Sequence, residues 1–174
     1  MAPHHFADLI RNVPDFPIPG VQFKDITPML GDANAFKSLI DQPVDRYADS
    51  KIDVVAGIES RGFIFSAPLA YRLGAGLVPI RKPGKLPADT VEVKYSLEYG
   101  SNTLQIHRDA FRRGARVLLV DDLLATGGTI GAAAELVSEL GGEIVELAFV
   151  IELKFLHGRD RLSGYPVFSL VQYE

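Results

Sequence analysis

The sequence predicts an α/β fold in which a central parallel sheet is flanked by helices. Three apolar runs, at residues 52–58, 76–80 and 116–120, lead into polar or glycine-containing loops, and helical patterns alternate with them. This alternation predicts right-handed βαβ units, whose strands lie parallel. Ligands bind beyond the carboxyl ends of such strands, so we expect the three loops to converge at one edge of the sheet.

The individual elements follow from the apolar runs and from composition. Loop 59–62 follows the first run, and the apolar stretch 63–73 after it is the expected helix. Residues 130–140 are rich in Ala, Leu and Glu, a composition typical of helices. Two more strands complete the expected sheet, at residues 144–151 and 167–170.

Two regions do not follow this alternation. Residues 12–28 hold several helix and strand breakers, and we expect an ordered flap there: Pro14, Pro17, Pro19, Gly20 and Pro28. Residues 83–103 are polar and long for a connection, which is typical of a lid. Within this lid, residues 95–99 could form a short hairpin arm.

Composition limits the class of protein. A chain of 174 residues with 47% hydrophobic and 23% charged residues fits one soluble domain. The net charge of −4 disfavours non-specific binding to nucleic acid. The sequence contains no cysteine, its start lacks the apolar core of a signal peptide, and no window reaches the roughly 18 apolar residues that span a membrane. We therefore expect a cytoplasmic, single-domain protein that does not act on a membrane.

The turn at residues 125–129, Ala-Thr-Gly-Gly-Thr, has the features of a phosphate site. It joins a strand to a helix N-terminus, where backbone N–H groups and the helix dipole favour an anion. Gly127 and Gly128 let the backbone approach an anion closely, and Thr126 and Thr129 add hydroxyl donors. It is not a P-loop, which needs Lys after its last glycine. The alternative is an ordinary helix N-terminus capped by Thr.

Two adjacent carboxylates, Asp121 and Asp122, precede this turn. They can accept hydrogen bonds from a diol or help to hold a divalent cation, so with the turn they predict a sugar phosphate as ligand. Neighbours along an extended strand point to opposite sides, so both serve one ligand only if the strand has already ended. The alternative is one structural ion pair and one solvated acid.

Residues 121–129 resemble the phosphoribosyl-diphosphate (PRPP) signature of the type I phosphoribosyltransferases. Five further segments resemble the adenine-using members of that family and extend the match over almost the whole chain: residues 14–26, 59–63, 81–87, 95–100 and 172–174. The resemblance implies one phosphoribosyltransferase domain over 1–174, with a hood over about 1–35 and a flexible lid loop over about 83–103. It also implies transfer of the ribosyl 5-phosphate of PRPP to N9 of adenine, which yields AMP and diphosphate.

The resemblance assigns residues to the donor. The 5-phosphate would lie in the turn formed by Ala125, Thr126, Gly127, Gly128 and Thr129, with Asp121 and Asp122 on the ribose hydroxyls. The diphosphate would meet Glu59, Ser60, Arg61, Arg81, Lys82 and Lys85, with a cis peptide expected at Glu59–Ser60. For Arg61 and the basic cluster, the alternatives are a surface ion pair and a solvated basic turn.

The acceptor, metal and partner also follow from the resemblance. Backbone groups of Gln22 and Lys24 would read adenine, with Phe23 and Leu153 on its faces. Glu98 would be the acid/base, with Tyr99 closing over the ribose and Arg61 completing the catalytic group. Mg²⁺ would be carried mainly by PRPP and water, without a protein metal site. Relatives supply part of the basic cluster of Arg81, Lys82 and Lys85 from the neighbouring subunit, which implies a homodimer with shared active sites.

Two other functions compete with this interpretation. The first is a PRPP-dependent enzyme for 6-oxopurines, for which we find no matching lysine motif. The second is a nucleotide-sensing regulator without catalysis, which the acidic net charge and the presence of Glu98 in the lid disfavour.

Overall fold

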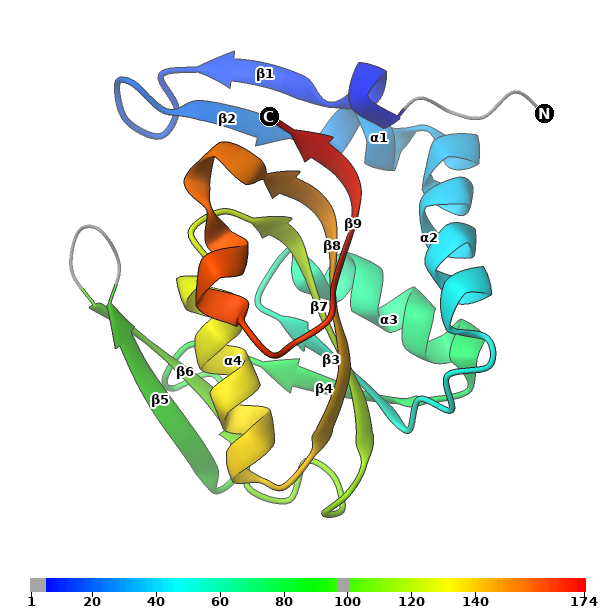
Figure 1. The fold of residues 1–174 in the computed structure, drawn as a ribbon, viewed down its shortest axis with the longest axis vertical. Coiled ribbons are helices and arrows are strands. Elements are labelled where there is room, and N and C mark those ends of the chain that lie inside the picture. The colour runs from blue at the N-terminus through cyan, green and yellow to red at the C-terminus, as the bar shows by residue number, and fades with distance from the viewer. Residues whose placement is uncertain (1–5, 97–100) are drawn as a thin grey trace. The chain divides into compact units, whose positions relative to one another are not determined.

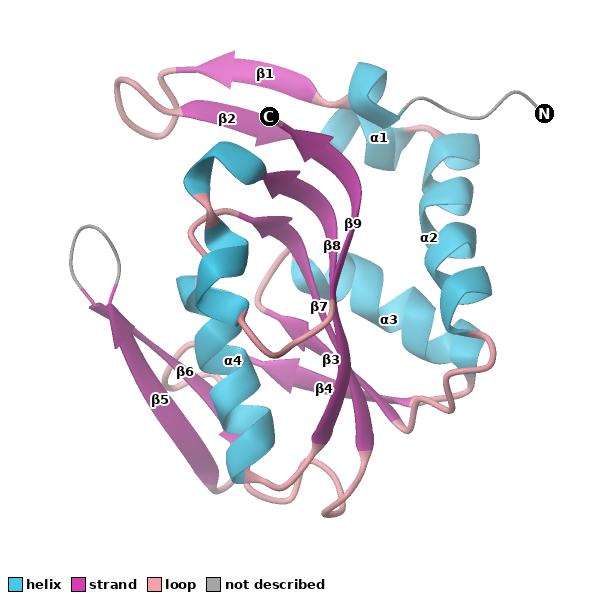
Figure 2. Ribbon diagram, in the orientation of Figure 1, coloured by secondary structure: helices cyan, strands magenta, loops and turns pink. Residues whose placement is uncertain are grey.

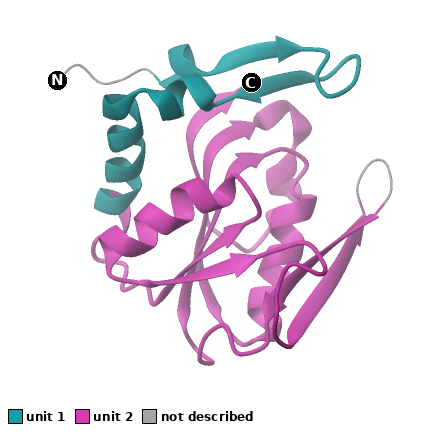
Figure 3. Cartoon of the chain, turned by 180° about the vertical axis from the view of Figure 1, so that it is seen from behind, with its two compact units in different colours: residues 1–45 teal, residues 46–174 magenta. Residues whose placement is uncertain are grey.

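The computed structural model describes residues 6–96 and 101–174 of the chain. The chain divides into two compact units, residues 1–45 and 46–174, which Figure 3 shows in teal and magenta. The larger unit holds the sheet and both of the helices that the sequence predicts. It also holds every loop expected to bind the donor.

A five-stranded sheet forms the centre of the larger unit, in the order β4-β3-β7-β8-β9, and every neighbouring pair is parallel (Figure 1). Its strands are β3 (Val54–Ile58), β4 (Gly76–Ile80), β7 (Arg116–Leu124), β8 (Glu143–Leu153) and β9 (Val167–Tyr173). The predicted parallel sheet is therefore confirmed, although β7, β8 and β9 extend beyond the predicted runs.

Helices α3 (Gly62–Leu73) and α4 (Gly128–Glu139) cover opposite faces of this sheet (Figure 2). Helix α3 connects β3 to β4 on one side, whereas α4 connects β7 to β8 on the other side. The step from β3 to β4 and the step from β7 to β8 run in opposite directions across the sheet. Because both crossovers are right-handed, this reversal places the two helices on opposite faces. The reversal lies between β3 and β7, which is the position where open α/β sheets bind their ligands.

Close packing of α3 on β3 depends on a glycine. A Cβ atom on Gly57 would lie 2.1 Å from Oγ and 2.7 Å from Cβ of Ser66 in α3. No side chain larger than hydrogen fits there unless the helix moves. Gly57 therefore fixes the distance between strand and helix just before the loop expected to bind diphosphate.

The segment predicted as a lid is a two-stranded hairpin over much of its length. Strand β5 (Thr90–Ser96) pairs antiparallel with β6 (Ser101–His107). Their alternate side chains Val91, Val93, Leu104 and Ile106 belong to the main hydrophobic core. The arm is therefore longer than the predicted hairpin at 95–99, and its base is packed against the body of the unit.

The smaller unit contains the predicted flap. Strands β1 (Arg11–Pro14) and β2 (Gln22–Asp25) pair antiparallel, and most of the breakers lie in the turn between them. In this turn Gly20 donates its backbone N–H to Asp15 Oδ1 at 2.7 Å. The flap is thus ordered, as expected.

The remaining elements are short, apart from one helix that the sequence did not predict. Helix α2 (Ala33–Tyr47) contains Pro43, which obscures its periodicity. The others are α1 (Thr27–Gly31) and the 3₁₀ turns η1 (Phe6–Leu9), η2 (Lys154–Leu156) and η3 (Gly158–Leu162).

Candidate active site

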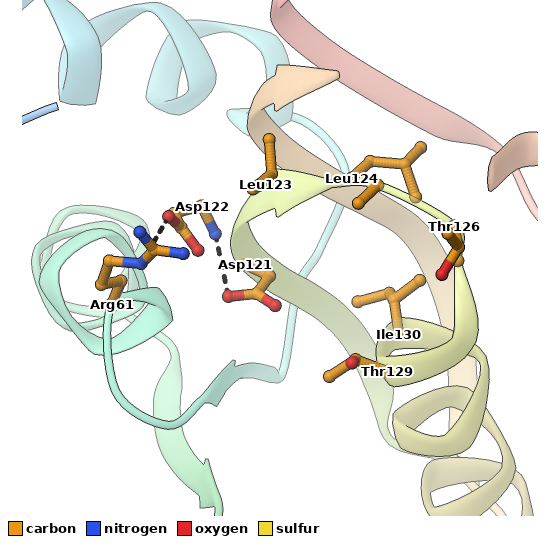
Figure 4. A pocket seen from close by; sticks show the side chains of 10 residues that line it. Arg61, Asp121, Asp122, Leu123, Leu124, Thr126, Thr129 and Ile130 are labelled. Atoms are coloured by element: carbon orange, nitrogen blue, oxygen red, sulfur yellow. Dashed lines mark hydrogen bonds and ion pairs between the residues drawn. The ribbon is translucent and has the colours of Figure 1, made fainter. Parts of the chain in front are cut away.

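A cavity of about 210 Å³ lies at the carboxyl end of β7, beside the reversal of the sheet (Figure 4). The loop after β3, the end of β7 and the turn into α4 line it together: Arg61, Asp121, Asp122, Leu123, Leu124, Ala125, Thr126, Gly127, Thr129 and Ile130. Two of the three loops expected to converge therefore meet around one cavity.

Both aspartates line this cavity although the strand has not ended. An end of the strand before Asp121 was the condition for both acids to serve one ligand, and it is not met, since β7 continues to Leu124 and Asp121 pairs with Phe149 of β8. Both side chains nonetheless line the cavity. They reach it because β3, the neighbour of β7 on the side away from β8, is shorter than β7. The pairing of β3 with β7 ends at Gly57 and Val120, which leaves that edge of β7 open.

The N-terminus of α3 occupies this open edge. A Cβ on Gly62 would lie 3.1 Å from Oδ1 of Asp121, so the helix start approaches the carboxylate closely. Arg61 Nε lies 2.8 Å from Oδ2 of Asp122. Gly62 thus brings the helix backbone close to Asp121, and Arg61 brings a positive charge to Asp122. Figure 4 shows Arg61 beside the two carboxylates.

The two carboxylates share a poorly hydrated site. Burial raises the pKa of Asp121 well above its ordinary value, and the charge of Asp122 raises it further. Burial also raises the pKa of Asp122, while Arg61 opposes that rise. The backbone N–H of Asp122 donates to Asp121 Oδ1 at 2.9 Å. A ligand that brings hydroxyl donors or a cation would favour the ionised pair.

The glycine turn presents backbone to the cavity. Gly127 is the N-cap of α4 with φ of 82°, and no side chain caps the helix. The alternative of an ordinary Thr-capped helix start is therefore not what the structure contains. Nη1 of Arg161 lies 3.7 Å from the position of a Cβ on Gly128, so a cation stands beside the positive end of the helix dipole. Such a place favours an anion.

A contact joins this turn to the hairpin arm. Tyr95 Oη lies 3.2 Å from Thr129 Oγ1, within hydrogen-bond distance. The Tyr95 ring also approaches Gly128, since a Cβ there would lie 3.6 Å from its Cδ2. The arm that leads to Glu98 and the turn expected to hold phosphate are thus connected through side chains.

The loop after β3 contains the expected cis peptide, between Glu59 and Ser60. Glu59 accepts hydrogen bonds from Nε and Nη2 of Arg81, both at 3.2 Å, and from the backbone N–H of Lys82 at 3.1 Å. Arg81 lowers the pKa of the Glu59 carboxyl through these bonds. Nη1 of Arg81 donates to the Lys85 carbonyl at 3.2 Å. Glu59 therefore organises the basic cluster, whose Lys82 and Lys85 are exposed.

The remaining predicted residues are those assigned to adenine and to proton transfer. Glu98 and Tyr99 lie outside the described residues. Gln22, Phe23 and Lys24 form part of β2 in the smaller unit, where Phe23 meets Phe16 edge-on at 5.1 Å between ring centroids. Leu153 ends β8 in the larger unit and is buried.

Sequence reasoning missed four residues around the turn: Tyr95, Gly158, Arg159 and Arg161. Tyr95 lies in a segment that we quoted for its resemblance without a role. The other three lie between β8 and β9, where no glycine-rich or acidic motif draws attention to them. Their contacts are formed only when that segment folds back onto the turn.

Comparison with known proteins agrees with this geometry. The family model "Phosphoribosyl transferase domain" matches residues 27–170. The adenine phosphoribosyltransferase of Chloroflexus aurantiacus is 66% identical over 99% of this chain and 100% of its own length. The crystal structure of the Thermoanaerobacter pseudethanolicus adenine phosphoribosyltransferase is 54% identical, with a TM-score of 0.94 over 97% of this chain and 98% of that one.

A further solved structure holds ligands. It is the Saccharomyces cerevisiae adenine phosphoribosyltransferase, complexed with adenine and D-2,5-dideoxy-2,5-imino-altritol 1,6-bisphosphate. It is 41% identical, with a TM-score of 0.89 over 95% of this chain and 96% of that one. The chain belongs to the phosphoribosyl transferase family and has its type I fold. Within that family it groups with the adenine phosphoribosyltransferases.

Proposed function

We propose that the chain carries out the adenine phosphoribosyltransferase reaction at the cavity beside β7. In this reaction the bond from ribose C1 of PRPP to the diphosphate oxygen breaks and a bond from C1 to N9 of adenine forms. The products are AMP and diphosphate, and the base loses a proton. The observation that carries the proposal is the meeting of two carboxylates, Arg61 and the glycine turn around one cavity.

The donor would be bound by the end of β7 and the turn that follows it. The N–H groups of the turn at residues 125–129 and the hydroxyls of Thr126 and Thr129 suit the 5-phosphate. The carboxylates of Asp121 and Asp122 suit the two ribose hydroxyls, which donate hydrogen bonds to them. Burial raises the pKa of both carboxyls, so hydroxyl donors or a cation from the ligand would stabilise charges that the protein surroundings disfavour.

The leaving group would be stabilised by cations. Negative charge develops on the diphosphate as the C1–O bond breaks, and donors directed at it lower the barrier. Arg61 stands at the N-terminus of α3, where its guanidinium and the helix dipole both favour an anion. Ser60 and the cluster of Arg81, Lys82 and Lys85 would complete this side, in part from the partner of a homodimer.

Mg²⁺ would accompany the diphosphate. It prefers oxygen ligands and retains several waters, so PRPP oxygens would hold most of it. Asp121 and Asp122 supply the hard oxygen donors that suit this ion, beside the place proposed for the ribose. Within residues 6–96 and 101–174, no cluster of three or more His, Asp or Glu side chains is arranged to hold a metal ion.

The acceptor would be held by the residues that the resemblance assigns to adenine. Backbone groups of Gln22 and Lys24 would read the edge of adenine, with Phe23 and Leu153 against its faces. Glu98 would exchange a proton with the ring as N9 attacks, and Tyr99 would close over the ribose. The support for these roles is the resemblance of residues 14–26 and 95–100 to adenine-using relatives.

A homodimer in the cytoplasm completes the proposal. Large apolar side chains are exposed on α3 and on the edge strand β4: Ile64, Tyr71 and Leu77. An exposed apolar edge of this kind is typical of a surface that another chain covers. None of the described helices is long and apolar enough to cross a membrane.

The test is incubation with PRPP, Mg²⁺ and one purine base at a time, following the release of diphosphate. We expect turnover with adenine and little with hypoxanthine or guanine. Turnover with a 6-oxopurine but not with adenine would make the chain a different phosphoribosyltransferase. Tight binding of PRPP without turnover of any base would favour the regulator instead.

A further inference from the structure

We propose that Gly158 and Arg159 are positioning residues that hold the glycine turn in its phosphate-binding shape. This inference rests on the proposed function, because it assigns the turn to the 5-phosphate of PRPP. Gly158 begins η3, the second of the two 3₁₀ turns between β8 and β9. The segment therefore joins the end of the strand that carries Leu153 to the back of the phosphate turn.

The two backbones are in direct contact. A Cβ on Gly158 would lie 2.2 Å from the carbonyl oxygen of Ala125 and 3.0 Å from Cδ1 of Leu124. From the other side, a Cβ on Gly127 would lie 2.4 Å from the carbonyl oxygen of Gly158. Real side chains do not approach backbone atoms this closely, so a side chain at either position would push the turn away. The contact requires glycine on both sides.

An ion pair between the buried Glu152 carboxylate and the partly exposed Arg159 guanidinium anchors the segment that makes this contact. Arg159 Nε and Nη2 lie 2.6 and 2.7 Å from the two carboxylate oxygens of Glu152. Ser169 donates its hydroxyl to Glu152 at 2.6 Å, and Arg159 Nη1 donates to the Val167 carbonyl at 3.2 Å. Glu152 is 2% exposed. Its hydrogen bonds with Arg159 lower the pKa of the Glu152 carboxyl, so Glu152 is ionised in this pair.

This geometry makes the pair a clamp between β8, β9 and the turn. A bidentate pair restrains both the distance and the angle of the guanidinium. Because Arg159 follows Gly158 directly, the restraint reaches the backbone that presses on Ala125 and Gly127. Neither Gly158 nor Arg159 is among the described residues that line the cavity. They would therefore act through the turn, without touching the ligand.

The test substitutes Gly158→Ala and compares it with Gly131→Ala. Gly158 does not have the positive φ that strains an L residue, so Ala there adds only the clash with the turn. A Cβ on Gly131 in α4 would meet only Leu162 Cδ2, at 4.0 Å. Calorimetric titrations with ribose 5-phosphate and with magnesium diphosphate separate the two ends of the donor.

We expect Gly158→Ala to weaken ribose 5-phosphate binding by about tenfold or more, because small displacements of a binding group have large effects. Its diphosphate affinity and all affinities of Gly131→Ala should match the wild type. Unchanged ribose 5-phosphate binding in Gly158→Ala would overturn the inference. Equal losses of affinity for ribose 5-phosphate and for magnesium diphosphate in Gly158→Ala would overturn it too, because they would indicate damage to the whole fold.

A second variant covers the case in which Gly158→Ala does not fold. Arg159→Lys keeps the charge but cannot form the two parallel hydrogen bonds of the guanidinium. It should therefore also lose affinity for ribose 5-phosphate selectively, by a smaller factor than Gly158→Ala. If the affinity of this variant for ribose 5-phosphate is unchanged, the clamp has no effect on the turn and the inference fails.

A third variant separates this inference from the proposed function. Thr126→Val with Thr129→Val removes two donors from the turn itself. If this variant binds ribose 5-phosphate normally, the phosphate site is misplaced and the proposed function fails at that point. If it binds weakly while Gly158→Ala binds normally, only the positioning role fails.

Discussion

The two loops at the sheet reversal hold their shapes in different ways. The turn at residues 125–129 is shaped by backbone packing, with Gly127 against Gly158. The loop at residues 59–62 is shaped by charge, since Arg61 pairs with Asp122 and Glu59 pairs with Arg81. Both loops lead into a helix N-terminus, and both are predicted to bind a phosphate group.

This difference predicts two kinds of binding. The turn can offer its N–H groups to a phosphate without breaking any ion pair. The charged loop must share or exchange its pairs when a diphosphate with Mg²⁺ arrives, because Arg61 and Arg81 already face carboxylates. We therefore expect the turn to act as a preformed anchor and the charged loop to rearrange during the reaction.

The largest effect should come from Asp121 and Asp122, which lie just before the turn at residues 125–129 and contact Arg61 and Gly62 at the start of α3. Asp121→Asn with Asp122→Asn removes two ionised acceptors from the ribose hydroxyls, and also the partner of Arg61. Hydrogen bonds to charged groups contribute about 1.5–3 kcal/mol each, so kcat/KM for PRPP should fall about a thousandfold. Steady-state kinetics would measure this. Activity within tenfold of the wild type would contradict the ribose assignment.

The next largest effect should come from Arg61→Gln. The charge that stabilises the developing diphosphate is then absent, and loss of one such donor lowers kcat by about a hundredfold or more. KM for PRPP should change much less, because the turn still anchors the 5-phosphate. Stopped-time assays at saturating PRPP would measure kcat. If Arg61→Gln instead raises KM for PRPP strongly and leaves kcat unchanged, the proposed difference between the two loops is wrong.

A stability measurement tests the electrostatics of the aspartate pair. The pKa of Asp121 is raised in the folded state, so that state binds the proton more tightly than the unfolded state does. Its contribution to stability is therefore greatest below the unfolded pKa of about 3.9 and falls as pH rises toward the folded pKa. Without ligand, Asp121→Asn should raise the melting temperature at neutral pH.

Asp53→Asn is the matched control with the opposite sign. The backbone N–H of Arg116 donates to Asp53 at 2.8 Å and lowers its pKa. The stability that Asp53 contributes is present above its unfolded pKa and is lost as pH falls, so Asp53→Asn should lower the melting temperature at neutral pH. Shifts of the same sign for both variants would contradict this account.

The smallest effect should come from Glu59→Gln. The pair with Arg81 is partly exposed, with 31% of the arginine side chain accessible, and such pairs contribute at most about 1 kcal/mol. Arg81 loses the partner that aims it, so KM for PRPP should rise by no more than about fivefold. Initial-rate kinetics would show this. A loss as large as that of Arg61→Gln would give Glu59 a direct role in binding.

The sequence predicted features with a local pattern. Apolar runs located the five strands of the sheet, and the acids at the end of β7 with the glycines after it located the cavity. The relative lengths of neighbouring strands have no such pattern. The sequence therefore did not show that β7 continues through Asp121 and Asp122 after its pairing with β3 ends at Val120.

Other features were missed because they arise from long-range contacts or from mixed patterns. The contact of Gly158 with Ala125 joins segments that are far apart in the chain. The pair of Glu59 with Arg81 depends on the registration of β3 with β4. In β5 the alternation of Val91 and Val93 with charged residues was a strand signal. The polar composition and proline content of residues 83–103 favoured a loop instead.

The most direct test measures two variants against the two ends of the donor. Calorimetry with ribose 5-phosphate and with magnesium diphosphate would be carried out on Thr126→Val/Thr129→Val and on Arg61→Gln. We predict a crossed pattern, in which the threonine variant loses affinity only for ribose 5-phosphate and Arg61→Gln loses affinity mainly for diphosphate. If both variants lose affinity for the same ligand, the two loops do not divide the donor between them.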